Sequence, residues 1–172
     1  NMFNAIDFAR FAIGTAAKAV AKVPAVNTRF HIGDRLNGPW PEGPFLWMHG
    51  ASLGECRMLL NLAKFLQEDI ANLPRILITT QKVEVVEFIK KTLSQAPESH
   101  IDVSIAPADT QTTMSLFAKS VKPIALILGE NELWPGYLST MRRLNIKPSV
   151  AIVSGRYRAS VPGIDFSPVA FA

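Results

Sequence analysis

Residues 45–55 read FLWMHGASLGE, and the order of features in this stretch decides the fold. A short apolar run ends at His49, a turn with two glycines follows, and Glu55 opens a stretch of helical spacing. An apolar run, a short turn and a helical pattern are the parts of a strand-to-helix unit. The same order recurs along the chain from Pro44 onward, which indicates parallel strands joined by helices.

Five apolar runs and four helical patterns make up this alternation. Nearly continuous apolar runs are typical of strands that are buried on both faces, and right-handed crossovers then place helices on both sides of the sheet. The predicted fold class is therefore α/β, a Rossmann-like open parallel sheet with helices on both faces. Its ligands are expected at the carboxyl ends of the strands. The predicted strands are FLWMH, RILITT, IDVSIA, IALILG and SVAIVS, and the predicted helices lie near 55–72, 82–95, 110–121 and 136–145.

Composition agrees with one globular domain. The chain has 172 residues, of which 48% are apolar and 19% charged, enough to bury a core. The net charge of +4 gathers in residues 1–40 and 141–172, whereas residues 41–140 are net negative. No basic run is interleaved with aromatic residues, so contact with an anionic surface or ligand fits better than a nucleic-acid groove. The single cysteine, Cys56, excludes an intrachain disulfide and is expected to be a packed thiol.

The N-terminal segment reads as one amphipathic helix, with Met2 expected to be the native start. Four charged residues interrupt it before Val23, so it has no apolar stretch long enough to span a bilayer. A mostly alanine face opposite a charged face is typical of a helix that lies in a membrane interface or packs on its own domain, and both remain open. The apolar face consists of Ala5, Phe8, Ala12, Ala16, Ala19 and Val23.

The turn after the first predicted strand contains G-x-S-x-G, the pattern of the nucleophile elbow in α/β-hydrolases. A serine hydrolase also needs a histidine later in the chain, and only His100 follows Ser52. His100 stands at the start of a predicted strand, at the edge opposite the ligand side. An esterase built on Ser52 is therefore the weaker hypothesis. Glu55 falls in the first helical turn, where it is either a capping carboxylate or the reactive group.

Two other predicted strands also end in polar clusters, GENELWPG and SGRYRAS. Because the carboxyl ends of parallel strands share one edge, these clusters are expected to converge with Glu55. Two carboxylates one residue apart, Glu130 and Glu132, would raise the pKa of one of them. The converging side chains would be Glu55, Glu130, Glu132, Arg156 and Arg158.

Metal and nucleotide-cofactor sites are not predicted. The glutamate pair offers too few ligands for a metal ion, and neither His31 nor His49 has helpful spacing. The glycines of the first loop match neither a Walker loop nor a dinucleotide fingerprint.

Together the three loops carry a family resemblance. WMHGASLGE, GENELWPG and SGRYRAS resemble, in order and spacing, landmarks in the N-terminal half of 3-deoxy-D-manno-octulosonic acid (Kdo) transferases, glycosyltransferases of lipopolysaccharide synthesis. In that family the loops read close to H-A-V-S-x-G-E, E-T-E-L-W-P-N and N-A-R-x-S. The resemblance covers about residues 35–160. The departures put the details of acceptor specificity in doubt, and they are Gly50-Ala51, Asn131, Gly136, Ser154-Gly155 and Arg158.

The resemblance implies a glycosyltransferase B fold of two Rossmann-like domains, with this chain as the N-terminal, acceptor-binding half. The donor CMP-Kdo would bind mainly to the C-terminal domain. Transfer to a lipid A precursor would invert the anomeric carbon and need no cofactor or obligatory metal. Glu55 matches the general base of the family. Residues expected to bind the acceptor or support the cleft are Ser52, Gly54, Glu132 and Arg156.

Three segments follow from this resemblance. Residues 2–34 would be the amphipathic helix and its lead-in, 35–160 the acceptor-binding domain, and 161–172 the start of a link to a C-terminal donor-binding domain. A phosphorylated lipid acceptor implies the cytoplasmic face of a bacterial inner membrane, reached peripherally or through the N-terminal segment. The isolated fragment is expected to be inactive. A non-catalytic α/β module that binds lipid or protein is the alternative, and the oligomeric state is left open.

Overall fold

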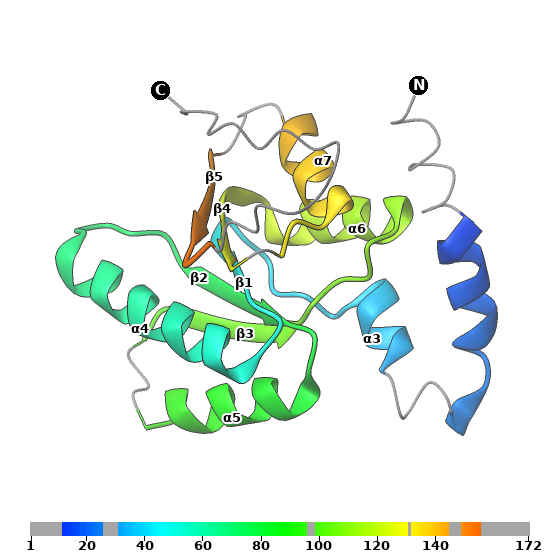
Figure 1. Ribbon diagram of the computed structural model, residues 1–172, viewed down its shortest axis with the longest axis horizontal. Helices are drawn as coiled ribbons and strands as arrows, with labels where there is room; N and C mark the ends of the chain where they lie inside the picture. Colours follow the sequence, from blue (N-terminus) through cyan, green and yellow to red (C-terminus); the bar gives the residue numbers. More distant parts are fainter. Residues whose placement is uncertain (1–11, 26–30, 96–98, 131, 145–148, 156–172) are drawn as a thin grey trace.

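The structure is a computed structural model that describes residues 12–25, 31–95, 99–130, 132–144 and 149–155. Five parallel strands form one sheet in the order β3-β2-β1-β4-β5 (Figure 1). The predicted α/β, Rossmann-like open parallel sheet is confirmed, and each strand begins and ends within one residue of its predicted run. The strands are β1 Phe45–His49, β2 Ile76–Thr80, β3 Ile101–Ile105, β4 Pro123–Gly129 and β5 Ser149–Val153.

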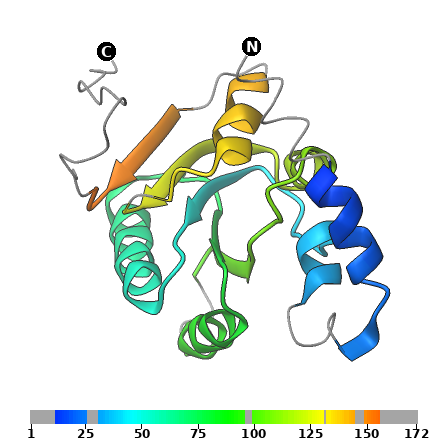
Figure 2. The ribbon, with the colours of Figure 1, turned by 45° about the vertical axis from the view of Figure 1, so that its right-hand side comes forward.

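Helices cover both faces of the sheet, as predicted (Figure 2). One face packs against α4 and α5, the other against α6 and α7, and the short α3 lies beside α6. The helices are α3 Ile32–Asn37, α4 Leu53–Asp69, α5 Val83–Leu93, α6 Gln111–Val121 and α7 Pro135–Arg143.

The central strand β1 shows why the runs are continuously apolar. Successive side chains of a strand point to opposite faces, so Phe45 and Trp47 enter the core on the α6 and α7 side, and Leu46 and Met48 enter the core on the α4 side. Every residue of β1 is buried. Burial of each large apolar side chain contributes roughly 1.5–3 kcal/mol, so the fully apolar strand stabilises both layers.

The strand order marks the ligand edge. From β1 the chain runs outward through β2 to β3, and it then crosses back to place β4 on the other side of β1. Open α/β sheets bind ligands at this reversal, outside the carboxyl ends of the strands. At that edge the register sets His49 of β1 beside Thr79 of β2 and Leu128 of β4.

The described part of the N-terminal segment is helical over residues 12–20 and lies beside α3 in both views (Figures 1 and 2). Gly14 is buried, and a Cβ there would stand 3.1 Å from the Thr110 Cβ. The helix therefore packs on its own domain, whereas Ile13 stays 61% exposed. The described members of the predicted apolar face are also exposed, namely Ala12, Ala16, Ala19 and Val23.

No helix among the described residues is long and apolar enough to cross a bilayer. Two parts of the predicted 2–34 segment, residues 2–11 and 26–30, lie outside the described residues. The predicted link at 161–172 also lies outside them.

Candidate active site

The turn between β1 and α4 is held by its own side chains. Ser52 is the N-cap of α4, and its Oγ accepts the Glu55 N–H at 3.2 Å and donates to Glu55 Oε1 at 2.9 Å. The Ala51 N–H donates to Glu55 Oε2 at 2.7 Å. This reciprocal arrangement is a capping box in which the carboxylate reaches one residue further back than usual. Glu55 thus has the capping contacts that its place in the first turn predicts.

Two glycines at the strand ends leave room for the Glu55 side chain. A Cβ at Gly50, after β1, would lie 3.0 Å from the Glu55 Cβ, and a Cβ at Gly129, the end of β4, would lie 3.3 Å from it. Glu55 therefore stands at the reversal between β1 and β4. Its side chain is half-buried, and each carboxylate oxygen keeps a lone pair for a further donor. A Cβ at Gly54, by contrast, would meet nothing closer than Ser52 Oγ at 3.9 Å.

The geometry assigns Ser52 to capping rather than to nucleophilic attack. Its hydroxyl contacts Glu55, whereas a serine nucleophile needs a base such as histidine within hydrogen-bond reach. His100 immediately precedes β3, at the amino edge of the sheet, as predicted. The neighbouring Cys56 is a packed thiol, also as predicted: it is fully buried, donates to the Gly50 carbonyl at 3.2 Å, and has its pKa raised by burial.

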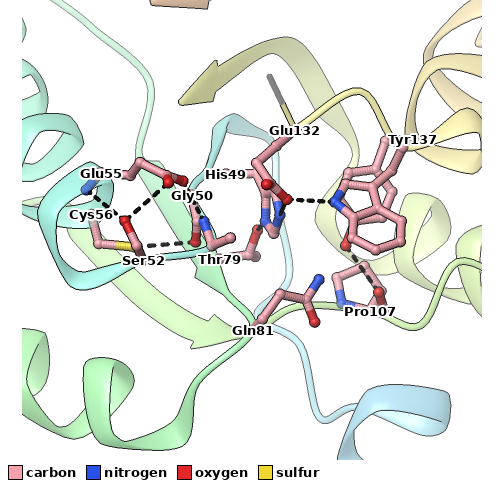
Figure 3. Close-up of polar contacts among 12 residues, drawn as sticks. His49, Gly50, Ser52, Glu55, Cys56, Thr79, Gln81, Pro107, Glu132 and Tyr137 are labelled. Carbon is pink, nitrogen blue, oxygen red and sulfur yellow. Dashed lines mark hydrogen bonds and ion pairs between the residues drawn. The ribbon is translucent and has the colours of Figure 1, made fainter. Parts of the chain in front are cut away.

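A second carboxylate stands in the loop between β4 and α7. Glu132 Oε2 accepts the Trp134 indole N–H at 2.7 Å and lies 3.7 Å from His49 Nε2 (Figure 3). The contact with His49 is the largest cause that lowers the pKa of Glu132; partial burial opposes it and the Trp134 indole adds to it. For Glu132 the shift runs opposite to the rise expected within a carboxylate pair, because an imidazole rather than another carboxylate faces it.

The predicted convergence is seen for two of the five residues. Glu55 and Glu132 flank His49 at the end of β1 (Figure 3). Glu130 has a left-handed backbone, φ 52°, and its N–H donates to the Val153 carbonyl at 2.9 Å, so its backbone forms the turn off β4. Arg156 and Arg158 lie outside the described residues.

The start of α7 is built from two loops. Pro135 begins the helix, as predicted, and the Gly136 N–H donates to Asp109 Oδ2 at 3.2 Å. Asp109 belongs to the loop after β3, so a side chain from another strand end caps α7. Trp134 occupies the N-cap position of α7 at the sheet edge and is 39% exposed.

Three buried residues that the sequence analysis did not assign join the two carboxylate loops. His49 is fully buried, and its Nδ1 lies 3.0 Å from Thr79 Oγ1. The Tyr137 ring meets the His49 ring edge-on at 5.0 Å, and its hydroxyl donates to the Pro107 carbonyl at 3.0 Å. Burial, and then the charge of Asp109, raise the pKa of Tyr137 far above its ordinary value. The available signal was that His49 ends β1 and Thr79 is the last but one residue of β2, two strands that prove to be neighbours.

A basic pocket opens at the same edge, beyond β2. Arg35 of α3 donates from Nη1 to Gln81 Oε1 at 2.6 Å and from Nη2 to the Gln81 carbonyl, which ties α3 to the loop after β2. Within the described ranges, no three or more His, Cys, Asp or Glu side chains gather as a metal ion would require. The pocket measures about 790 Å³ and is lined by His31, Ile32, Arg35, Gln81, Lys82, Val83 and Glu84.

Comparison with known proteins covers the part of the chain that contains the three loops. The sequence profile of the family described as 3-Deoxy-D-manno-octulosonic-acid transferase (kdotransferase) matches residues 19–162. The chain is 36% identical over 98 residues to the "Probable 3-deoxy-D-manno-octulosonic acid transferase, mitochondrial" of Arabidopsis thaliana, covering 57% of this chain and 21% of that protein. It is 25% identical over 115 residues to the 3-deoxy-D-manno-octulosonic acid transferase of Chlamydia pneumoniae, covering 67% and 25%.

A third relative, the 3-deoxy-D-manno-octulosonic acid transferase of Chlamydophila psittaci, is 24% identical over 133 residues, covering 75% of this chain and 29% of that protein. The chain thus spans between 21% and 29% of the length of these three curated relatives. Because the family profile covers most of the chain, the resemblance of the loops is confirmed. The chain belongs to the 3-deoxy-D-manno-octulosonic-acid transferase (kdotransferase) family.

Proposed function

We propose that this chain is the acceptor-binding part of an inverting glycosyltransferase that moves Kdo from CMP-Kdo to a lipid A precursor. Glu55 acts as the general base. Its carboxylate takes the proton of the acceptor hydroxyl while the hydroxyl oxygen bonds to the anomeric carbon of Kdo, and CMP leaves with the electrons of the broken bond. The donor binds mainly to a further domain, and no cofactor takes part.

One observation carries this proposal: the Glu55 carboxylate is fixed at the topological reversal of the sheet and remains half-exposed. The Ala51 N–H and the Ser52 hydroxyl each occupy one of its oxygens, so the carboxylate has little freedom to rotate. A general base works when its oxygen lies within about 2.6–3.2 Å of the oxygen whose proton it removes. An oriented carboxylate holds its free lone pair ready for that contact.

Glu132 and the basic pocket have supporting roles. Glu132 shapes the cleft beside Glu55 and orients acceptor groups through its free oxygen. The pocket offers two cations, Arg35 and Lys82, which suit the anionic groups of a phosphorylated acceptor, and His31 lies beside them. Ser52 supports Glu55, Gly54 gives the acceptor space at the helix start, and Arg156 is assigned to anionic groups by its place in the family motif.

The test is Kdo transfer from CMP-Kdo to a lipid A precursor by the full-length protein. A general base contributes about 10²- to 10⁴-fold, so Glu55→Gln is expected to lower kcat by that amount. Glu68→Gln is the matched control, because Glu68 is an exposed glutamate on the same helix, α4, but lies at its other end, away from the ligand edge. It is expected to retain wild-type transfer.

Four results discriminate the hypotheses. A large loss in Glu55→Gln alone supports the general base. Near-normal transfer by Glu55→Gln would contradict it, and activity lost in Ser52→Ala but kept in Glu55→Gln would favour a serine enzyme instead. A wild-type protein that binds the acceptor but transfers nothing would favour the non-catalytic binding module.

We also propose that the N-terminal segment rests on an anionic membrane surface at the cytoplasmic face of a bacterial inner membrane. Its described helix exposes Ile13 and Val20 together with Lys18 and Lys22, the combination of apolar and cationic side chains that binds such surfaces. Flotation with anionic and neutral vesicles tests this in the full-length protein. Ile13→Asp is expected to weaken binding to anionic vesicles.

The control for the membrane test is Phe65→Asp. Phe65 is 60% exposed, as much as Ile13, but it lies on α4 at the other side of the molecule (Figure 1). Equal losses in the two variants would contradict a specific role of the N-terminal helix.

A further inference from the structure

Among the described residues of the site, His49 has a buried polar atom that faces a carboxylate without a hydrogen bond. Its ring is fully buried at the end of β1, and Nε2 makes no hydrogen bond within the described part of the chain. That nitrogen lies 3.7 Å from Glu132 Oε2, beyond the usual range of a direct hydrogen bond. A buried polar atom without a partner is costly, so the position of this ring calls for a physical reason.

The hydroxyl of Thr79 decides where the imidazole proton can be. A threonine hydroxyl has one proton and two lone pairs. The Trp47 indole N–H, which can only donate, occupies one lone pair at 2.8 Å. The single hydroxyl proton then has two possible acceptors, His49 Nδ1 at 3.0 Å and the Met48 carbonyl at 3.4 Å.

Distance and charge select the same arrangement. The contact from Thr79 to His49 Nδ1 is shorter than the contact to the Met48 carbonyl, so the hydroxyl donates to Nδ1 and the proton of the neutral ring sits on Nε2. In the other arrangement a bare Nε2 lone pair would face the Glu132 carboxylate in a buried place. Two acceptors facing each other repel, whereas an N–H group attracts the carboxylate.

We propose that His49, held as its Nε2–H tautomer by Thr79, is a positioning residue that aims the Glu132 carboxylate at the edge between β1 and β4. A continuous line of donors results: the Trp47 indole donates to Thr79, Thr79 donates to His49, and the His49 N–H points at Glu132. From the other side the Trp134 indole donates to the same Glu132 oxygen. This arrangement leaves the second Glu132 oxygen for the cleft.

The lowered pKa of Glu132 agrees with this picture, since the imidazole is its largest cause. The Tyr137 ring fixes the plane of the imidazole by its edge-on contact, with an interplanar angle of 85°. No contact in this network involves the sugar donor CMP-Kdo or the acceptor substrate. The effect on catalysis, however, rests on the proposed transferase function.

The first test needs no substitution. Selective ¹⁵N-histidine labelling of the full-length protein, read by long-range ¹H–¹⁵N NMR at pH 7, reports which ring nitrogen carries the proton. We expect His49 to show an unprotonated Nδ1 and a protonated Nε2, with its signal identified by its loss in His49→Gln. A protonated Nδ1 would overturn the proposal.

The second test compares two amide replacements. The glutamine amide of His49→Gln reaches the position of Nε2 and can still donate to Glu132, whereas the asparagine amide of His49→Asn reaches only the position of Nδ1. His49→Asn leaves Glu132 without the N–H group that faces it, and a misplacement of about 1 Å in an active site can cost about 10²-fold in rate, so this variant is expected to lower kcat/KM for the acceptor roughly 10- to 100-fold. His49→Gln should stay within a few-fold of wild type.

The indole signals show whether Glu132 moved. In ¹⁵N-tryptophan spectra, the Trp134 resonance reports its bond to Glu132, and Trp40 serves as an internal reference because its indole N–H has no partner within the described ranges. His49→Asn should shift Trp134 and leave Trp40 in place. Equal rates and an unmoved Trp134 in both variants would reject the positioning role. If the wild type transfers nothing, the proposed function fails, and the imidazole and indole signals alone decide the role of His49.

Discussion

The two carboxylate loops at the ligand edge are held in different ways. Glu55 is fixed within its own turn, by Ser52 and Ala51, three and four residues away. Glu132 is fixed in part by its neighbour Trp134 and in part by His49 on another strand. The contacts that hold Glu55 therefore form together with α4. The contacts that hold Glu132 also require the pairing of β4 with β1.

This difference assigns different sensitivities to the two sites. A change inside the β1 to α4 turn acts directly on Glu55, through atoms in contact with its side chain. A change in the layer below acts on Glu132 through His49, which faces its carboxylate, or from further away through Thr79 and Tyr137, which hold His49. Substitutions that act on one loop and spare the other test whether the two loops are held independently. The largest effect is expected where the packing around a loop is tightest.

Among the glycines of the two carboxylate loops, Gly50, Gly54 and Gly129, the tightest packing is at Gly50. A Cβ added at Gly50 would lie 3.0 Å from the Glu55 Cβ, 3.2 Å from Leu59 Cδ1 and 3.3 Å from Cys56 Sγ, so these three side chains must give way slightly to admit it. Overpacking of this kind costs about 1–3 kcal/mol, and Gly50→Ala is expected to lower the free energy of unfolding by that amount in urea denaturation. Because Glu55 is displaced, transfer should fall as well.

Gly54→Ala is the matched control for this prediction. It adds the same methyl group two residues into α4, where the nearest atom is 3.9 Å away. Alanine in place of an unstrained glycine stabilises by about 0.4–1 kcal/mol. Equal loss of unfolding free energy in Gly50→Ala and Gly54→Ala would show that any methyl group added in this turn is destabilising, and that the contact with Glu55 is not the cause.

Tyr137 tests the layer beneath the second loop. Tyr137→Phe removes the bond to the Pro107 carbonyl and leaves that acceptor unpaired, at a cost of about 1–2 kcal/mol near neutral pH. The folded-state pKa of Tyr137 is raised, so its contribution to stability is fully present below the unfolded pKa of about 10 and is lost as pH rises above it. The wild type should thus lose its advantage over Tyr137→Phe in alkali.

Urea denaturation at neutral pH and above pH 10 measures this difference. A stability gap that stays constant over that range would contradict the burial of a neutral tyrosine. The Trp134 indole resonance supplies a second measurement, since the Tyr137 ring lies 6.3 Å from that of Trp134 and a repacked ring would shift it.

Much of the fold was predictable because it depends on local pattern. The apolar runs gave the strand bounds, and the central strands β1 and β2 are buried on both faces, whereas the edge strand β5 is largely exposed although its run is equally apolar. The capping box at Ser52 and Glu55 was also readable, since both partners lie within one helical turn. The lowered pKa of Glu132, by contrast, could not be predicted, because the imidazole that faces its carboxylate comes from another strand.

The role of His49 could not be predicted for the same reason. Its contacts with Thr79 and Glu132 require strand order and register, which hydrophobic spacing does not specify. Once β1 is known to lie between β2 and β4, the residues near the carboxyl ends of these neighbouring strands become candidates for contact. The register then predicts the pair of His49 and Thr79 directly.

The substitution with the smallest expected effect gives the finest test of the difference between the Glu55 and Glu132 loops. Trp134→Phe keeps an aromatic ring at the N-cap of α7 but removes the N–H that Glu132 accepts at 2.7 Å. The folded-state pKa of Glu132 is lowered, so its contribution to stability is present above the unfolded pKa of about 4.3 and is lost as pH falls through the folded value. Trp134→Phe should reduce this contribution only in part, because the larger cause, His49, remains. Since both groups are partly exposed, the loss at pH 7 should be about 0.5–1 kcal/mol and diminish as pH falls through the folded pKa of Glu132. A loss that is unchanged after the Glu132 carboxylate has been protonated would mean that Trp134 acts on α7 itself, and the two loops would then differ less than their contacts indicate.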